Sequence, residues 1–494
     1  MKTSIRLIKN VLFIALMLVP FLLSAQKVSD SIDVFLKNKM KQLQIPGLQL
    51  AVIRDGKLEK LSSYGYANLE YRIPTAKNTV FSINSMTKAF VGVAIMQLQE
   101  QGKLKVDDSI SLYIADLPDQ WKKITIRQIL SNVSGLPNNI DQKEQLLGDG
   151  NEEKNWELVK QLPMEFTPGE KFSYNQTGYI IIGKVITALS GQHFTKFIEE
   201  NQFKPCHMLV TQFGDSNDII PNSGGAYSTI INTGDKWINN GKLHTVFADF
   251  PVFFRTATGI ISSAEDLSRW LIALQNGQLL KDTSSISQLF TTTQLNDGHI
   301  GGFNSLTNGY ALGWPTVVRE EYPAAAPVGG MRSALFVYPQ NNLSVVVLTN
   351  LQGSNPEWFI DEIASYYLPG MKIKNGFGLS PNMKLLRKEL IKKGFKNTNL
   401  IYKTLKQNNK NFNLTEGEIN AWGYQLLSLD KKEEALFIFQ QNTMLYPDSS
   451  NVYDSYGEIL ETMGHRKEAI MNYKKSLLLN PDNTNARDYL KDKQ

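Results

Sequence analysis

The stretch that decides the fold is residues 79–90, which read TVFSINSMTKAF. Within it, Ser85 and Lys88 stand three residues apart, and apolar spacing up to Glu100 predicts a helix that begins near Ser85 and ends at Gly102. Side chains three residues apart share one face of a helix, so the Ser85 hydroxyl and the Lys88 amine are expected to be neighbours. Burial lowers the pKa of a lysine, and a neutral amine can take the proton of a serine nucleophile. The pattern therefore predicts an activated serine.

A serine three residues before a lysine is a weak signal by itself, because Ser24–Lys27 and Ser428–Lys431 share the spacing. The context of Ser85 is more specific, since further landmarks follow it in order. They are residues 102–104, 106–108, 124–130, 134–137, 168–170, 258–267 and 310–314. Over about residues 45–350 this order resembles the β-lactamase-related serine hydrolases, which include class C β-lactamases, D-alanyl-D-alanine carboxypeptidases and esterases. The resemblance implies that Ser85 is the nucleophile and that Lys88 manages its proton.

The second catalytic element of that family is a tyrosine followed two residues later by an asparagine, and Tyr174 stands at its place. The resemblance makes Tyr174 the shared acid and base that passes the Ser85 proton to the leaving group. The alternative is a buried packing tyrosine. Gln176 replaces the usual asparagine and keeps an amide with a longer reach, which leaves its substrate contact open, while Asn175 is expected to point elsewhere.

The third element of the family is a lysine or histidine before glycine on a strand that lines the site. Here the glycines Gly329 and Gly330 are present, but Pro327 and Val328 stand where the cation belongs. The glycines are expected to offer a backbone N–H to an oxyanion hole, paired with the N–H of Ser85. Arg332 either supplies the positive charge or is an exposed surface arginine.

Other segments predict a mixed α/β (α+β) domain with an antiparallel sheet flanked by helices. Residues 48–53, 58–66, 334–338 and 343–349 are expected to be strands, with a hairpin turn at 54–57. Residues 124–131, 179–189 and 264–275 are expected to be helices. The predicted hydrolase domain spans residues 26–372.

The tail carries an internal repeat. The positions 423, 435, 439 and 447 (Gly, Ala, Phe, Pro) recur as Gly, Ala, Tyr and Pro at 457, 469, 473 and 481. A period of 34 residues resembles tetratricopeptide repeats, and the alternative is two ordinary helical hairpins. We expect an all-α repeat domain over 419–494, with 482–491 as a capping helix, after a helical linker at 373–418.

The amino terminus predicts export. Lys2, Arg6 and Lys9 precede an apolar run from 11 to 23, and Ser24-Ala25 offers a cleavage site, so residues 1–25 are interpreted as a signal peptide. The expected location is the periplasm or the exterior, with membrane anchoring only if the signal is uncleaved. One cysteine excludes an internal disulfide.

Two functional hypotheses follow. The first is an exported serine hydrolase that acts through an acyl-enzyme on a peptide, ester or β-lactam-like carbonyl. The second is a catalytically faded binding protein whose repeats hold a protein partner. No cofactor, metal or nucleic acid is expected, since the histidines have no metal-like spacing and a formal charge of +5 includes three cations of the signal segment.

Overall fold

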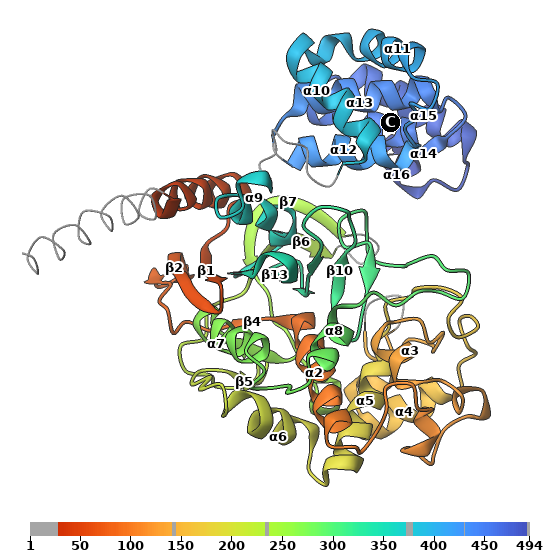
Figure 1. The fold of residues 1–494 in the computed structure, drawn as a ribbon. Helices are drawn as coiled ribbons and strands as arrows, with labels where there is room; N and C mark the ends of the chain where they lie inside the picture. Colours follow the sequence, from red (N-terminus) through yellow and green to blue (C-terminus); the bar gives the residue numbers. More distant parts are fainter. Residues whose placement is uncertain (1–27, 141–144, 233–236, 372–378, 429, 492–494) are drawn as a thin grey trace, which may run out of the picture. The chain divides into compact units, whose positions relative to one another are not determined.

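The computed structural model describes residues 28–140, 145–232, 237–371, 379–428 and 430–491, so the predicted signal peptide lies outside the described residues. The chain divides into two compact units, the first ending at Leu368 and the second beginning at Pro369. Figure 1 shows that the first combines strands and helices and that the second is helical. The predicted site residues all belong to the first unit.

An antiparallel sheet forms the centre of the first unit. Its strands are β1 (Gly47–Arg54), β2 (Lys57–Asn68), β3 (Ile73–Pro74), β9 (Gly309–Tyr310), β10 (Pro315–Val317), β11 (Ala324–Ala325), β12 (Val328–Gly329), β13 (Ser333–Tyr338) and β14 (Leu343–Thr349). Their order is β3-β2-β1-β14-β13-β11-β10-β9, with β12 paired to β13. The predicted turn joins β1 to β2. Its residues Asp55 and Gly56 have φ values of 50° and 70°, the left-handed pair that a tight hairpin turn requires.

Two three-stranded sheets lie beside the large one. One contains β15 (Leu351–Gln352), β6 (Tyr227–Asn232) and β7 (Trp237–Thr245), and the other contains β4 (Phe81–Ser82), β8 (Ile260–Ser262) and β5 (Gln212–Phe213). The pairing of β4 with β8 matters most for the site, because β4 leads directly to Ser85.

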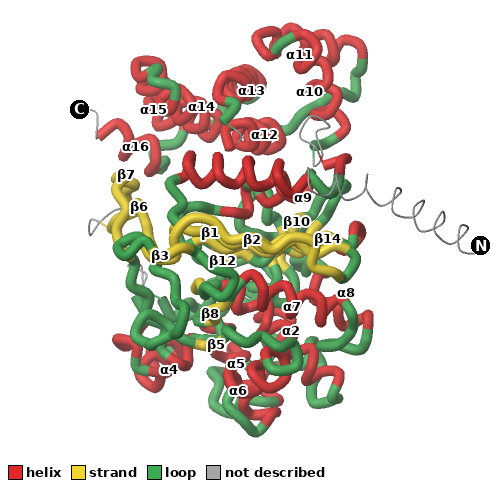
Figure 2. Tube along the Cα trace, turned by 90° about the vertical axis from the view of Figure 1, so that its left-hand side faces the viewer, coloured by secondary structure: helices red, strands yellow, loops and turns green. Residues whose placement is uncertain are grey.

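Helices cover both faces of the large sheet, and other helices of the first unit lie farther from it. The helices of this unit are the helical residues 28–43, α2 (Thr87–Glu100), α3 (Ile126–Leu130), α4 (Glu152–Lys160), α5 (Thr177–Ser190), α6 (Phe194–Ile198), α7 (Ala264–Gln275), α8 (Thr283–Phe290) and α9 (Ile360–Ser365). Figure 2 shows residues 28–43 and α9 on one face and α7 with α2 on the other. The contacts of α7 with β1 and of α9 with β14 agree with this layering.

Helix α2 runs through the core, since each of its residues from Thr87 to Leu98 is buried. Two glycines let the loop at residues 310–314 approach it. A Cβ at Gly92 would lie 2.1 Å from the Leu312 carbonyl oxygen, and one at Gly313 would lie 2.4 Å from the Lys88 carbonyl oxygen. Because no side chain fits in either place, the loop fixes the position of the helix that carries Lys88.

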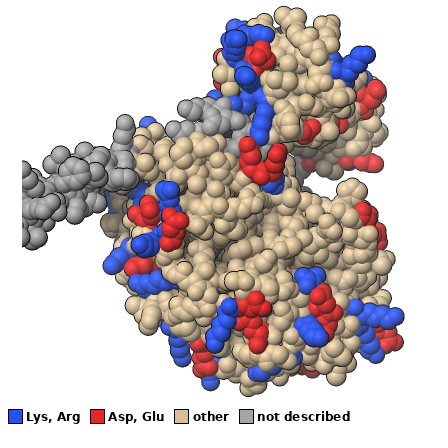
Figure 3. All heavy atoms as spheres, viewed as in Figure 1, with Lys and Arg blue, Asp and Glu red and all other residues tan. Residues whose placement is uncertain are grey.

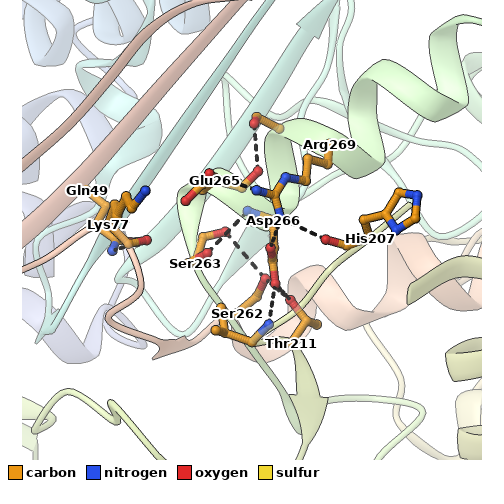
Figure 4. Close-up of polar contacts among 11 residues, drawn as sticks. Gln49, Lys77, His207, Thr211, Ser262, Ser263, Glu265, Asp266 and Arg269 are labelled. Atoms are coloured by element: carbon orange, nitrogen blue, oxygen red, sulfur yellow. Dashed lines mark hydrogen bonds and ion pairs between the residues drawn. The ribbon is translucent and has the colours of Figure 1, made fainter. Parts of the chain in front are cut away.

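Asp266, in the first turn of α7, ties the end of β8 to its surroundings (Figure 4). Its Oδ2 accepts a hydrogen bond from the Thr211 hydroxyl at 2.9 Å, and that hydroxyl lies 2.7 Å from Ser262 Oγ. Its Oδ1 accepts one from Arg269 at 3.2 Å, and Ser263 caps the helix by accepting from the Asp266 N–H at 3.2 Å. The network joins the end of β8 and the start of α7 to Thr211, the residue directly before β5.

The second unit consists of helices that repeat their contacts. They are α10 (Pro381–Lys393), α11 (Thr398–Asn408), α12 (Glu416–Ser428), α13 (Lys432–Leu445), α14 (Ser450–Thr462), α15 (Arg466–Leu479) and α16 (Thr484–Lys491). A Cβ at Gly423 would meet the Phe439 ring at 2.7 Å, and 34 residues later a Cβ at Gly457 would meet the Tyr473 ring at 3.1 Å. The sequence period is therefore a period of helix contacts, while the tetratricopeptide assignment stays a prediction.

The region predicted as a helical linker contains α10 and α11. Met383 and Leu390 of α10 and Ile401 of α11 lie in one hydrophobic core with Trp422 and Phe439. These helices therefore pack as part of the second unit.

The surface of the first unit mixes both charges. On the face in Figure 3, Lys and Arg lie among Asp and Glu, so neither sign dominates it. In the part of the chain that the structure describes, no helix is both long enough and apolar enough to cross a membrane. Cys206 is 5% exposed, and burial raises the pKa of its thiol to about 12.

Candidate active site

Ser85 lies in a 3₁₀ turn, Asn84–Met86, directly before α2. Asn84 has a φ of 50°, a left-handed conformation that is costly for a residue other than glycine and that concentrates at functional sites. Its side-chain amide donates a hydrogen bond to the Ser82 carbonyl oxygen at 3.1 Å. Ser85 is half-buried at the N-terminus of the helix, where backbone N–H groups favour negative charge.

Lys88 is fully buried, and its Nζ donates a hydrogen bond to the Ala257 carbonyl oxygen at 2.7 Å. The same atom lies 4.8 Å from the ring centroids of both Tyr174 and Tyr179. No carboxylate among the described residues pairs with it, and burial lowers the Lys88 pKa well below its ordinary value. A neutral amine at this position can accept a proton.

Tyr174 precedes α5 and lies between Lys88 and a group of aromatic rings. Its ring is 4.9 Å from that of Phe303 and 6.4 Å from that of Tyr310. Burial raises the pKa of its hydroxyl to about 12, while hydrogen bonds with the side chains of Ser85 and Gln176 act in the opposite direction. The structure thus joins the Ser85 and Tyr174 side chains and stacks the Lys88 amine against the Tyr174 ring.

The neighbours of Tyr174 are held by the loop at 132–138. Asn175 points away from the serine, as predicted, because its amide donates to the Leu136 carbonyl oxygen at 2.7 Å and accepts from the Gly178 N–H at 2.9 Å. Asn132 accepts the Asn175 N–H at 3.1 Å. This loop contains the sequence landmark at 134–137, and its contacts hold the two residues that follow Tyr174.

Gln176 follows Asn175 in this segment, and only some of its polar groups have interaction partners. Its N–H donates to Asn138 Oδ1 at 3.2 Å, and its side chain lies close enough to the Tyr174 hydroxyl to lower the pKa of that group. Its Oε1 is buried and has no hydrogen-bond partner within the described structure. A buried amide oxygen without a donor is costly, so this atom is available to a ligand N–H.

The two glycines of the third element pack against the serine turn. A Cβ at Gly329 would lie 2.0 Å from the Ile83 carbonyl oxygen, and one at Gly330, whose φ is 55°, would lie 2.6 Å from the Asn84 amide nitrogen. The Ser333 hydroxyl lies 3.0 Å from the Ile83 carbonyl oxygen and can donate to it. The backbone at 329–330 is therefore placed beside the segment that ends at Ser85.

Of the two alternatives for Arg332, the prediction of an exposed surface arginine is wrong. Arg332 is only 6% exposed, because β13 begins at the next residue and carries it inward. Its Nε is buried without a hydrogen-bond partner in the described ranges, and burial lowers the pKa of its guanidinium to about 10. Arg332 lines a cavity that reaches Ser82 but includes none of Ser85, Lys88 and Tyr174.

Three groups at the site were not identified from the sequence. The Ala257 carbonyl oxygen, the Tyr179 ring and the left-handed Asn84 each support Lys88 or Ser85. A carbonyl acceptor leaves no mark in residue types. Of the three, only Tyr179 could have been inferred from the sequence, because it lies five residues after Tyr174 at the start of a predicted helix.

Comparisons with known proteins show to which family the chain is similar. The family described as Beta-lactamase matches residues 32–365. The chain is 27% identical over 329 residues to "Protein flp" of Staphylococcus aureus (strain MRSA252), covering 65% of this chain and 63% of that relative, which is less than two thirds of its length. It is 24% identical over 339 residues to "N-acetylmuramyl-L-alanine amidase" of Bacillus subtilis (strain 168), covering 62% and 77%.

A solved structure shows the same fold. The D-amino acid amidase from Ochrobactrum anthropi SV3 superposes with a TM-score of 0.59 at 19% identity, over 70% of this chain and 99% of that chain. The match of residues 32–365 covers more than half of the chain and contains Ser85, Lys88 and Tyr174. The chain belongs to the Beta-lactamase family of serine hydrolases.

Proposed function

We propose that this chain is an exported hydrolase that cleaves an amide bond of a peptide or amino-acid amide through an acyl-enzyme at Ser85. The observation that carries the proposal is that the Ser85 side chain lies close enough to the Tyr174 hydroxyl to lower its pKa, beside a buried Lys88 whose own pKa is lowered. A hydrogen-bonded hydroxyl next to a neutral amine is the arrangement that turns serine into a nucleophile.

In the acylation step, Ser85 Oγ attacks the substrate carbonyl carbon and its proton passes through the Tyr174 hydroxyl to Lys88 Nζ. Tyr174 stays protonated at neutral pH, since its pKa is about 12, so it relays the proton and Lys88 accepts it. The tetrahedral intermediate collapses when Tyr174 protonates the leaving nitrogen and regains a proton from Lys88. Water then attacks the ester by the same route and releases Ser85.

The developing oxyanion is stabilised by backbone donors. Ser85 stands at a helix N-terminus and its N–H is one donor, while Gly329, at the end of β12, and Gly330, in the turn that follows, lie beside the Ser85 turn. Each oxyanion-hole donor is worth about 10²–10³ in rate in known hydrolases. This role uses the two glycines without the cation that the family pattern places before them.

Gln176 favours an amide over an ester. The N–H of a bound amide would supply the donor that its buried Oε1 lacks, and an ester oxygen has no proton to give. The names of the two amidases among the similar proteins point in the same direction.

The first test is covalent labelling. Purified protein and its Ser85→Ala variant are incubated with a fluorophosphonate, and intact mass is measured. We expect one adduct on the wild type and none on the variant. A folded wild-type protein without an adduct would reject the proposal and favour the second candidate, a binding protein, which the missing cation before Gly329 supports.

Substrate class is tested with matched pairs, such as D-phenylalanine amide and D-phenylalanine methyl ester. Gln176→Leu keeps the side-chain volume but removes the acceptor, so we expect it to lower kcat/KM for the amide by at least about tenfold and to leave the ester nearly unchanged. Equal losses on both substrates would remove Gln176 from amide recognition.

Export is tested separately. We propose that residues 1–25 direct the chain out of the cytoplasm, on the basis of the charged and apolar pattern of the amino terminus. Fractionation of cells that express the full chain, with mass measurement of its amino terminus, is expected to find an exported protein that begins at Gln26. A cytoplasmic protein that keeps Met1 would reject the proposal.

A further inference from the structure

The cavity that Arg332 lines lies in the first unit beside the turn from β12 to β13. It has a volume of about 360 Å³, which is within the range of small-molecule sites. Its walls come from β4, from residues 215–227 and from residues 245–250, and none of Ser85, Lys88, Tyr174 and Gln176 lines it. Figure 1 shows β4, β6 and β7, three of the strands that carry part of these walls.

Arg332 brings a buried cation to the wall of this cavity, and no ion pair is formed by it in the described structure. The side chain is 94% buried by its 6% exposure, and its Nε has no hydrogen-bond partner among the residues described. Burying a cation costs several kcal/mol unless a charged or polar partner repays it, so an arginine kept here without one points to a missing anion.

The acidic residues of the walls do not neutralise Arg332, because each binds elsewhere. Asp215 and Asp218 both pair with Arg255, at 3.4 Å and 3.0 Å. Glu70 accepts a hydrogen bond from the Tyr227 hydroxyl at 2.7 Å.

A second buried polar group lines the same cavity. Ser82 Oγ, on β4, is buried and lacks a hydrogen-bond partner in the described structure. Two unsatisfied atoms of residues that line one cavity, Arg332 Nε and Ser82 Oγ, can both donate a hydrogen bond, which is the set that a carboxylate requires.

The remaining walls mix polar residues with a group of apolar side chains. Phe81, Phe250 and Ile261 line the cavity, and Phe247 lies at its exposed side, with 69% of its surface accessible. A small ligand that fills this space is therefore expected to combine an anionic group with an apolar body.

We propose that this cavity binds a small carboxylic acid with an apolar or aromatic body, whose carboxylate is held by Arg332 and Ser82, at a site separate from the acyl-transfer cleft. The planar carboxylate matches the fork of a guanidinium, whereas a tetrahedral phosphate matches it less well in a cavity with one hydroxyl. The proposal does not depend on turnover at Ser85.

The test is a calorimetric and thermal-shift titration of the full chain with phenylacetate. Phenylacetamide is the neutral control ligand, and acetate and inorganic phosphate test the apolar body and the anion geometry. We expect millimolar or tighter binding of phenylacetate, at least tenfold weaker binding of the other three, and a rise in Tm with phenylacetate alone.

Variants locate the site. Arg332→Met is expected to weaken phenylacetate at least tenfold and to be no less stable than the wild type without ligand, because it removes an unpaired buried charge. Arg332→Lys keeps the charge, so it tests the site if the methionine variant fails to fold, and it is expected to retain partial binding. Ser82→Ala is expected to weaken binding several-fold. Arg54→Met, an exposed arginine of the same unit, is the matched control and is expected to have no effect.

Cleft variants separate the two proposals. Ser85→Ala and Gln176→Leu are expected to leave phenylacetate binding unchanged, even if the amidase proposal fails. Binding that Arg332→Met and Arg332→Lys leave intact, binding lost in Ser85→Ala, or preference for phosphate over phenylacetate would each overturn the proposal.

Discussion

Lys88 Nζ donates a hydrogen bond to the carbonyl oxygen of Ala257, a residue 169 positions further along the chain. The contact fixes the amine between the Tyr174 and Tyr179 rings, and it joins α2 to the segment that enters β8. An uncharged polar acceptor orients the amine without raising its pKa as a carboxylate would, and this relationship underlies the first two predictions.

The first prediction concerns the pH dependence of acylation. Only the neutral form of Lys88 accepts a proton, and its pKa is lowered by burial, so the rate of fluorophosphonate labelling is expected to rise with pH through that lowered pKa and to level off below 10.5. Tyr174, with a pKa of about 12, is expected to add no step below pH 11. Labelling rates measured from pH 4 to 11 check this. A first rise only above pH 10 would contradict it.

The second prediction concerns stability. A lysine whose pKa is lowered in the fold binds more protons when unfolded, so the free energy of unfolding rises with pH between the lowered pKa and the unfolded value near 10.5. Lys88→Met is expected to remove that slope, to be no less stable at pH 7, and to lose about 10²–10⁴-fold in kcat/KM. Urea unfolding at pH 7 and 9, beside activity, measures both.

The third prediction concerns the contact between β12 and the serine turn. Gly329→Ala would place a Cβ 2.0 Å from the Ile83 carbonyl oxygen, and it is expected to cost about 1–3 kcal/mol and most of the labelling rate. Gly102→Ala is the control, because its φ of 70° is strained but no atom lies within 4 Å of the added Cβ. We expect Gly102→Ala to keep the wild-type labelling rate. Equal effects of the two variants on labelling would disprove the role of the contact.

The fourth prediction concerns the repeated contact of the second unit. Gly423→Ala meets the Phe439 ring at 2.7 Å, whereas Gly457→Ala meets the Tyr473 ring at 3.1 Å, so the first is expected to lower the Tm of the helical unit more than the second. Both variants are expected to keep wild-type fluorophosphonate labelling at Ser85. Calorimetry of the full chain measures the first effect and intact mass the second.

The elements that the sequence predicts well carry their signals locally. The helix expected at 264–275 is α7 with the same limits, because Ser263 supplies its N-cap, and the helix after Ser85 ends before Gly102 as expected. The helix expected at 124–131 is shorter and begins at Ile126, since Thr125 caps it with its hydroxyl and Gln128 returns a hydrogen bond. Local capping thus sets the limits that hydrophobic spacing leaves open.

The features that the sequence does not predict depend on distant partners. The burial of Arg332 follows from the pairing of β13 with β14, and the left-handed Asn84 from its packing against Gly330. Short strands such as β4 and β5 exist only because β8 lies between them. The residue types near Ser85 and Tyr174 were enough to identify the candidate catalytic side chains. The orientation of those side chains depends on chain segments more than 40 residues away, as in the hydrogen bond between Asn175 and Asn132.

Cys206 has a practical consequence for measuring motion in this chain. It is the single cysteine of the sequence, and its thiol is buried with a pKa raised to about 12, so it reacts slowly with maleimides at neutral pH. A cysteine introduced on an exposed side of each compact unit can therefore be labelled with donor and acceptor dyes without first mutating the native one. Single-molecule energy transfer between the dyes would then report how the hydrolase unit and the helical unit move with respect to each other during turnover.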